Sequence, residues 1–414
     1  MGPVRRVAGE MFASLRHRNY RLFWTGQLIS VTGNWMNQVA QGWLVLELSN
    51  SSVVLGTVGA LQWLPVLFLT AFAGAVADRY PKRRVLLCTQ TALLLLAAVL
   101  GTLTVTGHVR IWHVMAVATL TGVVNAFDNP TRQSFIVELV GKQDLANAIA
   151  LNSSLFNAAR VVGPSLGGFV IGALGVGTAF LLNALSYVAV LVGLALMTPT
   201  LEPPRPARRR LLAEVGEGLA YLRATPSVSW PIVLLGVVSL FAINWNILLP
   251  LLAKQVLHVG PEGLGLLYTA LGLGALVGAL ALAANAHHAI RFESVAAYAT
   301  AFSATQLLVG FVPLFYVDLA LLAVAGYTMI RFTASSNSLV QSLVPDGLRA
   351  RVMSVYFLVF GGSSPFGNEF AGAVAAGWGP RAAFAAGAVL AGTFAAYVWL
   401  RETRRSDAEV AAGT

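Results

Sequence analysis

The sequence has few charged residues and almost no cysteine, and both scarcities narrow what this protein can be. Charged residues make up 11% of the 414 residues and hydrophobic residues 57%, whereas roughly a quarter of the residues of an ordinary soluble domain are charged. The single cysteine, Cys88, excludes an internal disulfide and a cysteine-based metal cluster. The composition therefore excludes a soluble protein and predicts a protein of the lipid bilayer.

Patterns of catalytic and nucleotide-binding residues are missing too. The sequence contains no H-E-x-x-H and no P-loop. The glycines at 272, 274 and 278 lie in an apolar run with no strand before it, so helix packing explains them better than a nucleotide loop. All six histidines are expected in loops or at helix ends: His17, His108, His113, His258, His287 and His288. We therefore expect no catalytic residues, metal or cofactor, and a membrane-embedded enzyme or a receptor is the less favoured alternative.

Long apolar runs, by contrast, recur along the whole chain. Each is long enough to cross the hydrocarbon core as a helix, and none shows the alternation of a barrel strand. The sequence predicts twelve spans, at residues 20–46, 53–77, 85–107, 112–130, 147–173, 176–198, 228–252, 262–284, 292–314, 316–339, 350–374 and 380–401.

The net charge of +10 follows the predicted topology. Most of the 27 lysines and arginines fall in the termini and in the loops after even-numbered spans, which is the pattern of cytoplasmic segments. Both termini are therefore predicted to be cytoplasmic. The arginines at 205 and 208–210 are interpreted as an anchor near anionic lipid rather than a nucleic-acid patch. No apolar run precedes residue 20, so no removable signal peptide is expected.

A polar, proline-containing break divides six spans from six. It predicts an N-terminal bundle at 1–198, a cytoplasmic linker at 199–227, and a C-terminal bundle with its tail at 228–414. Within the break, 211–223 has the spacing of an amphipathic surface helix. Asn34-Trp35 and Asn244-Trp245 occupy corresponding places in the two halves, which is typical of parallel repeats in transporters, although chance similarity between apolar helices is the alternative.

One loop carries a family resemblance. After the second span the chain reads Gly74-Ala-Val-Ala-Asp78-Arg79-Tyr-Pro-Lys-Arg83-Arg84, which resembles the G-x-x-x-D-R-x-x-R-R signature of the major facilitator superfamily. Glycine would let the second span pack closely, and aspartate could cap a neighbouring helix while pairing with arginine. The resemblance implies a gate formed by Gly74, Asp78, Arg79, Arg83, Arg84, Asp128 and Arg132.

The fifth span adds a second resemblance. Gly163-Pro164-Ser-Leu-Gly167-Gly168 is similar to the G-P-x-x-G-G signature of exporters in this superfamily, and with Arg160 it predicts a kinked, closely packed helix. A packing kink without directional meaning is the alternative. The segments 127–135 and 337–351 resemble the branch of siderophore exporters, such as the enterobactin exporter, and macrolide efflux proteins.

Three departures from the family pattern concern the gates and the coupling mechanism. Pro81 replaces a frequent glycine, and His287-His288 stand where the second-half loop has an acidic-basic pair. The fourth span lacks the mid-helix arginine of many proton-coupled relatives. The second gate is therefore expected to be weaker, and the mechanism of coupling stays open.

Four carboxamides in the first span form a polar stripe. Asn34, Asn37, Gln38 and Gln41 share one helical face, which would be costly against lipid. The resemblance places helices one, four, seven and ten around a cavity, which implies a substrate site lined by this stripe and by a further group: Trp35, Asn244, Trp245, Asn246 and Arg331. Hydrogen bonding between helices, with the tryptophans as interface anchors, is the alternative.

Charges inside the spans suggest a coupling site. Arg160, Arg331 and Glu369 fall within apolar runs, where charges usually face cavities or partners. Glu369 is interpreted as the one carboxylate well inside a helix, and therefore as the proton carrier, with neutralisation of an arginine as the alternative. Glu47 and Asp318 are expected to be solvated near the outer ends of their spans.

The sequence thus predicts an all-α membrane protein of twelve transmembrane helices in two pseudo-symmetric six-helix bundles. The favoured function is proton-coupled efflux of amphipathic or hydrophobic small molecules by alternating access, and the alternative is a lipid or lysolipid translocator of the same fold. We expect a monomer in the bacterial cytoplasmic membrane, with substrate, protons and membrane lipids as partners and no nucleic acid.

Overall fold

The computed structural model describes residues 12–141, 143–198, 211–284, 290–312 and 314–412. Within these ranges the side chains of residues 71, 75, 77–78, 211–215 and 403–412 are not described. The predicted anchor arginines, His287-His288 and the Asp78 side chain therefore lie outside the described residues.

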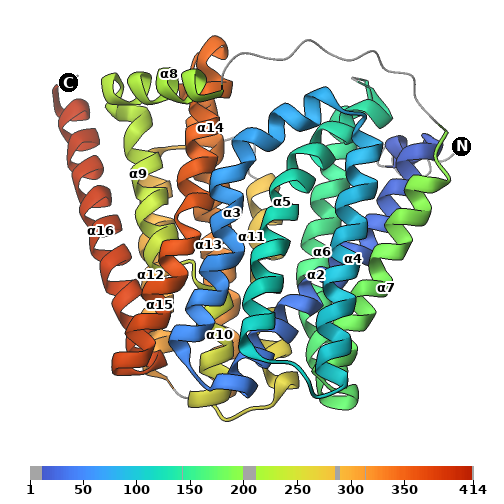
Figure 1. Cartoon of the computed structure of the whole chain (residues 1–414). Coiled ribbons are helices and arrows are strands. Elements are labelled where there is room, and N and C mark those ends of the chain that lie inside the picture. Colours follow the sequence, from blue (N-terminus) through green and yellow to red (C-terminus); the bar gives the residue numbers. More distant parts are fainter. Residues whose placement is uncertain (1–11, 142, 199–210, 285–289, 313, 413–414) are drawn as a thin grey trace, which may run out of the picture. The chain divides into compact units, whose positions relative to one another are not determined.

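Most of the described chain is helical, and each of the twelve predicted spans falls on one helix or on consecutive helices (Figure 1). Ten segments are long and apolar enough to cross a membrane in the described part of the chain. The first half contains η1 (Ala13–Arg16), α2 (Arg18–Ser49), α3 (Ser52–Arg79), α4 (Lys82–Val105), α5 (Ile111–Val140), α6 (Leu145–Leu174) and α7 (Val176–Ala195). The second contains α8 (Leu211–Ala224), α9 (Pro226–Phe241), α10 (Trp245–Leu251), η2 (Leu252–Val256), α11 (Pro261–Ala284), α12 (Phe292–Phe311), α13 (Phe315–Leu343), α14 (Asp346–Gly362), α15 (Ser364–Trp378) and α16 (Pro380–Ala412).

Most predicted helix boundaries hold to within a few residues, but the end of the fourth span was wrong. The expected end near 130 coincides with Pro130, yet α5 continues through this proline to Val140. The hydroxyl of Thr131 donates to the carbonyl of Phe127 at 2.7 Å, and that of Ser134 donates to the carbonyl of Pro130 at 3.0 Å. A membrane helix tolerates proline where side chains and neighbours satisfy the disturbed backbone.

The chain divides into two compact units. The first comprises Met1–Leu44 and Leu64–Arg208, and the second comprises Val45–Trp63 and Arg209–Thr414. The connection between α2 and α3 thus belongs with the second unit, which differs from a division at the linker alone. Lys254 of η2 donates to the carbonyl of Leu46 at 2.6 Å. A Cβ at Gly56 of α3 would lie 2.7 Å from the carbonyl oxygen of Asn368 on α15, so only glycine allows this close approach.

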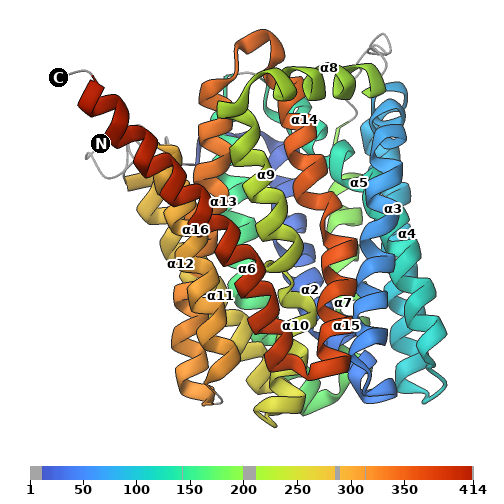
Figure 2. The ribbon, with the colours of Figure 1, turned by 90° about the vertical axis from the view of Figure 1, so that its left-hand side faces the viewer.

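Two spans of the second unit are broken. The seventh runs from α9 through a break at Ala242–Asn244 into α10 and the π-helical turn η2. The eleventh changes from α14 to α15 at Ser363 (Figure 2). Pro365 stands in the first turn of α15, where its missing N–H costs no intrahelical bond.

The predicted amphipathic segment forms α8, which lies across the ends of α9 and α14 (Figure 1). Arg351 of α14 pairs with Glu217 at 2.8 Å. A Cβ at Gly218 would lie 2.7 Å from the carbonyl oxygen of Arg351, so α8 sits close against the start of α14.

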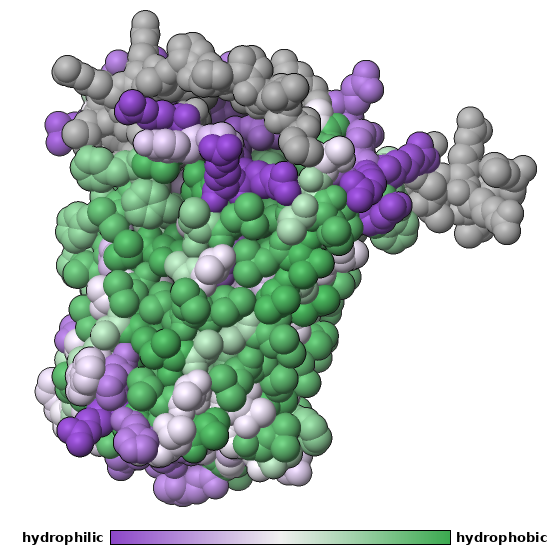
Figure 3. Space-filling model, turned by 45° about the vertical axis from the view of Figure 1, so that its right-hand side comes forward, coloured by the Kyte–Doolittle hydropathy of each residue, from purple (hydrophilic) through white to green (hydrophobic). Residues whose placement is uncertain are grey.

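The surface pattern is that of a membrane protein. Large apolar side chains are exposed on many helices, including Phe68 and Phe72 of α3 and Trp112 of α5. Figure 3 shows apolar residues over the middle of the helices and hydrophilic residues near their ends. The exposed apolar belt is the surface that hydrocarbon covers.

Candidate functional site

The polar stripe lies on α2, in the first unit. All four carboxamide residues are half-buried on this continuous helix, so they share one face as predicted. The hydroxyl of Tyr187 on α7 donates to Asn34 Oδ1 at 2.5 Å. Asn34 is thus held by a neighbouring helix, while Asn37 and Gln38 offer amide groups that are partly accessible. The role of the stripe in binding substrate stays a prediction.

The glycine motif of α6 packs against this same helix. A Cβ at Gly163 would lie 2.5 Å from Trp35 Cβ and 2.7 Å from the carbonyl oxygen of Thr32. A Cβ at Gly167 would lie 3.2 Å from the Cα of Met36. No side chain fits at Gly163, so the motif lets the backbones of α2 and α6 approach closely. The helix is continuous through Pro164.

Arg160 lies one turn before the glycine motif and covers the ring of Trp35. Its guanidinium carbon is 5.6 Å from the ring centroid. Such a cation–π contact stabilises by roughly 0.5–2 kcal/mol, depending on desolvation. The contact gives the one arginine of the predicted fifth span an aromatic partner on α2. Trp35 is therefore positioned from two sides, by the glycine motif and by the arginine.

A buried ionic cluster joins three helices of the first unit. Asp128 of α5 is fully buried and accepts hydrogen bonds from Thr89 Oγ1 at 2.7 Å and Gln90 Nε2 at 2.8 Å, both on α4. Arg132 donates to Asp128 Oδ2 at 2.5 Å and also to Gln27 Oε1 of α2 at 3.2 Å. Charge and donors on all sides of the carboxylate satisfy its buried oxygens.

Asp128, which is among the residues expected in the gate, lies inside α5 and joins α4 directly and α2 through Arg132; its role in a gate stays a prediction. The expectation that Glu369 is the one carboxylate well inside a helix was wrong, because the longer α5 places Asp128 within a helix and buries it.

The predicted gate sequence is held at the start of α4. Lys82 forms an ion pair with Glu138 of α5. Arg83 donates to the carbonyls of Leu194 and Ala195, at 2.7 and 3.0 Å, at the end of α7. A cation at a helix C-terminus satisfies free carbonyls and the helix dipole. These contacts fix the first turn of α4 to α5 and α7.

The other predicted gate residues are placed differently. Apart from its own helix and its chain neighbours, no described residue has an atom within 4 Å of a Cβ built at Gly74, and the close packing expected of this glycine stays a prediction. Arg79 and Arg84 are exposed. Arg132 pairs with Asp128 rather than lying free for the gate. The gate itself stays a prediction.

In the second unit, Asn244 and Trp245 pack the protein interior. Trp245 is 4% exposed, donates through Nε1 to the sulfur of Met329, and meets the ring of Phe302 at 5.9 Å. Asn244 is 1% exposed, and its Nδ2 donates to the carbonyl of Leu240 at 2.9 Å where α9 ends. Both were expected in a cavity wall; burial makes them interior anchors of the break between α9 and α10. Asn246 is half-buried.

The remaining charges within the spans have neutral partners. Arg331 of α13 donates to the hydroxyl of Tyr298 on α12 at 2.5 Å and lies over its ring at 4.6 Å. Glu369 of α15 is exposed and accepts hydrogen bonds from Thr57 Oγ1 of α3, at 3.2 and 3.3 Å to its two oxygens. In the part of the chain described, the partner found for this carboxylate is therefore a hydroxyl rather than an arginine.

Asp318 corrects another expectation. It was expected to be solvated, but at the first turn of α13 it is fully buried. Glu47 is exposed as predicted. This burial depends on tertiary packing, which the apolar pattern of α13 alone does not reveal.

Several residues of these clusters escaped sequence reasoning. Thr89 and Gln90 are consecutive polar residues within the apolar run of α4, and Gln27 is a carboxamide in the run of α2. Polar residues within spans mark interhelical contacts, so this signal was present. Thr57 carried no such signal, because threonine commonly bonds its own helix backbone.

Comparison with known proteins agrees with the helical architecture. Residues 9–412 match the family described as transmembrane secretion effector. The staphyloferrin A transporter of Staphylococcus aureus is 28% identical over 63% of this chain and 66% of its own. The multidrug efflux pump Tap of Mycolicibacterium fortuitum is 27% identical over 87% of this chain and 90% of its own. Macrolide efflux protein A of Streptococcus pyogenes is 20% identical over 85% and 89%.

Solved structures share the fold at low sequence identity. An inward-facing bacterial homologue of the human lysosomal transporter Spinster has a TM-score of 0.71 at 14% identity, covering 92% of this chain and 96% of its own. The nucleoside transporter NupG has a TM-score of 0.70 at 12% identity, covering 92% and 98%.

Proposed function

This chain belongs to the transmembrane secretion effector family of the major facilitator superfamily, and from this premise we propose that it exports amphipathic or hydrophobic small molecules of the drug or siderophore type. It is a multi-pass membrane transporter and not an enzyme. The proposed site is the bacterial cytoplasmic membrane, with both termini cytoplasmic and the chain acting as a monomer. The relatives named as a siderophore transporter, a multidrug pump and a macrolide efflux protein support the cargo class.

The observation that carries the proposal is the half-buried amide face of α2. Asn37 and Gln38 lie partly accessible on the helix that also carries Trp35. Amides can donate or accept hydrogen bonds, so this face can meet polar groups of either kind on a ligand. Such a surface suits ligands that combine a few polar groups with a large apolar body.

Transport is proposed to proceed by alternating access, with the α3–α4 connection as a gate. Asp78, Arg79 and Arg84 would hold one closed state, as the signature sequence implies. Lys82 is held by an ion pair to α5, and Arg83 by hydrogen bonds to the end of α7. These contacts fix the α4 side of the connection in place. When the gate opens, the α3–α4 turn would then move together with α5 and the end of α7.

Proton influx is proposed as the driving force, with Glu369 as the proton carrier. Its carboxylate is exposed within a span and is held by the hydroxyl of Thr57. A hydroxyl can donate to the ionised carboxylate and accept from the protonated acid, so the same pair suits both states. Asp128, surrounded by three donors and fully buried, is better suited to a permanent structural tie.

An accumulation panel tests the function directly. The protein is expressed in an efflux-deficient bacterial host, and cellular levels of macrolides, other amphipathic drugs and siderophores are compared with cells that express a double variant, Asn37→Leu/Gln38→Leu, at equal membrane levels. We expect lower accumulation of at least one compound only with the wild-type protein. Equal accumulation of every compound would contradict drug export. If the protein also moves a labelled lysolipid across the membrane of proteoliposomes, lipid translocation becomes the proposed function instead.

A further inference from the structure

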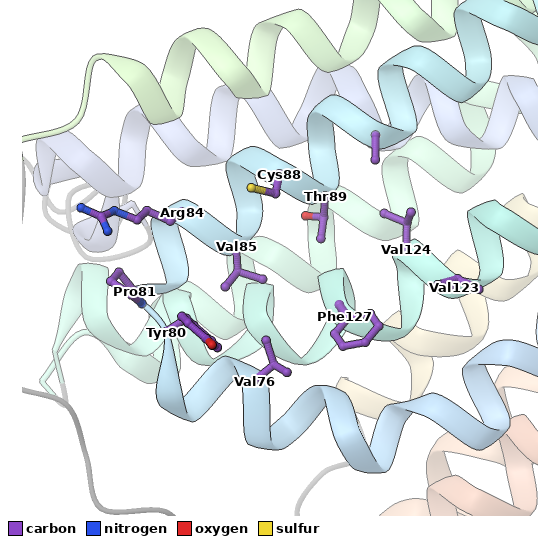
Figure 4. Close-up of a pocket in the computed structure, with 11 residues that line it drawn as sticks. Val76, Tyr80, Pro81, Arg84, Val85, Cys88, Thr89, Val123, Val124 and Phe127 are labelled. Atoms are coloured by element: carbon purple, nitrogen blue, oxygen red, sulfur yellow. The ribbon is translucent and has the colours of Figure 1, made fainter.

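A pocket of about 410 Å³ lies between α3, α4 and α5 of the first unit (Figure 4). We call it the α3–α5 pocket. Its volume falls in the roughly 300–1,000 Å³ range of ligand sites. Its lining is almost entirely apolar, and it is formed by Val76, Tyr80, Pro81, Arg84, Val85, Cys88, Thr89, Ala92, Val123, Val124 and Phe127. Apart from Arg84 of the proposed gate, these lining residues have no part in the function proposed above.

Among the described residues that line the pocket, Arg84 is the one that carries a charge. Figure 4 shows Arg84 beside Pro81 at the α3–α4 turn, whereas Val123 and Phe127 lie toward the opposite end. Arg84 and Tyr80 are exposed. Lys82 and Arg83, the neighbours of Arg84 in the same basic run, are engaged by Glu138 and by the end of α7. The body of the pocket is therefore apolar, and Arg84 lies at its α3–α4 end with the guanidinium directed away from the other lining residues.

The pocket opens on the side of α4 that faces lipid. Arg84, Cys88, Leu95 and Val99 share one face of this helix by their spacing. Cys88 is exposed, and Leu95 and Val99 are 56% and 52% exposed. Large apolar side chains exposed on a membrane helix face hydrocarbon. Entry from the bilayer is thus the natural route into the pocket.

We propose that the α3–α5 pocket binds an anionic phospholipid of the adjacent leaflet. The headgroup phosphate sits at Arg84 and the α3–α4 turn, and an acyl chain lies along Val85, Cys88 and Phe127. A guanidinium is a strong donor to phosphate oxygens, and an anionic leaflet surface attracts basic residues next to a span. The bound lipid adds a membrane-derived contact at the turn proposed as the gate.

Lipid selectivity is measured first by native mass spectrometry. Wild-type protein, Arg84→Gln and Ala92→Phe are released from nanodiscs that contain equal amounts of phosphatidylglycerol and phosphatidylcholine. Arg84→Gln removes the headgroup contact, and Ala92→Phe fills the chain site. The control is Arg110→Gln, which also removes one positive charge but lies at the start of α5, away from the pocket. We expect wild type and Arg110→Gln to retain phosphatidylglycerol about fivefold over phosphatidylcholine, the effect of about one basic contact at an anionic surface.

The single cysteine then locates the lipid. Alkylation of Cys88 by N-ethylmaleimide should be slower in phosphatidylglycerol than in phosphatidylcholine membranes, and Arg84→Gln should remove most of this difference. Cys88→Ser/Leu95→Cys, with the cysteine on the same face but outside the pocket, corrects for the effect of surface charge on thiol reactivity. If Ala92→Phe does not fold, Arg84→Gln still tests the headgroup contact.

Three results would overturn the proposal. The first is equal retention of both lipids by the wild type. The second is a preference that Arg84→Gln leaves unchanged. The third is protection of Cys88 by an exported compound in phosphatidylcholine membranes with none from phosphatidylglycerol, which would make the pocket a cargo site. A wild-type protein that exports nothing but keeps the lipid preference would reject only the proposed function.

Discussion

Replacing Asp128 by asparagine should destabilise the first unit strongly although the change in shape is small. The carboxylate accepts bonds from Arg132, Thr89 and Gln90, and its side chain is fully buried. Asparagine keeps one oxygen acceptor but turns an NH2 group toward a set of donors. Arg132 then loses its anionic partner. Because its side chain is only 12% exposed, an unpaired charge is left buried.

Removing one partner of a buried ion pair costs about 3–5 kcal/mol. We expect the lower end, about 3 kcal/mol, because Arg132 retains its bonds to Gln27 and Asn129. Asp144→Asn in the same unit is the matched control. Its ion pair with His17 is partly solvated, with 34% and 40% of the two side chains exposed, so the expected loss there is below about 1 kcal/mol.

The free energy of unfolding is measured in mixed detergent micelles by titration with sodium dodecyl sulfate, followed by tryptophan fluorescence. Asp128→Asn should unfold at clearly lower denaturant than Asp144→Asn. The double variant Asp128→Asn/Arg132→Gln should be more stable than Asp128→Asn alone, because it removes the unpaired buried charge. Equal stability of Asp128→Asn and Asp144→Asn would refute the assignment of Asp128 as a structural tie.

Three further changes test packing, coupling and cargo recognition. Gly163→Val should lower the free energy of unfolding by about 1–3 kcal/mol through overpacking, because its Cβ would meet α2; Gly74→Ala, with open space around the Cβ, should change stability little in the same titration. Glu369→Gln should abolish uptake driven by a pH gradient in inverted proteoliposomes while sparing ligand binding, and Glu47→Gln, on an exposed residue, should retain it; unchanged proton-driven transport in Glu369→Gln would exclude this residue as the carrier. Asn37→Leu should shift the affinity or range of exported compounds more than the amount of folded protein; a variant that only fails to fold would make this amide a structural contact.

The two signature motifs show how far local sequence leads. In α6 the glycines at 163 and 167 predicted close packing, and the structure supplies the partner, α2. In the α3–α4 connection the basic run was evident, but Lys82 and Arg83 turned out to have different partners, on α5 and α7. A motif reports which residue types are needed, whereas the partner depends on helices that are distant in the sequence.

The buried polar residues show the opposite case. Asp318 looked solvated near a helix start, and Trp245 looked like a ligand platform, yet both are buried. Their position along the helix was predicted well enough. Whether each side chain is buried depends on the side of the helix from which it projects and on which helices pack against that side. A period of 3.6 residues distinguishes faces only where polar and apolar residues alternate, and nearly uniform apolar spans provide little such contrast.

What the sequence by itself determined is the membrane-embedded helical fold, because each span must satisfy its backbone internally and reach across the hydrocarbon core, and both demands are local. The length of α2 and the amide face on it follow from the same local rule. Only the tertiary structure decided that Asp128 is enclosed by α2, α4 and α5, that Thr57 meets Glu369, and that two spans of the second unit are broken. These features depend on side chains from segments far apart in the chain, whose close approach arises from packing that no single span encodes.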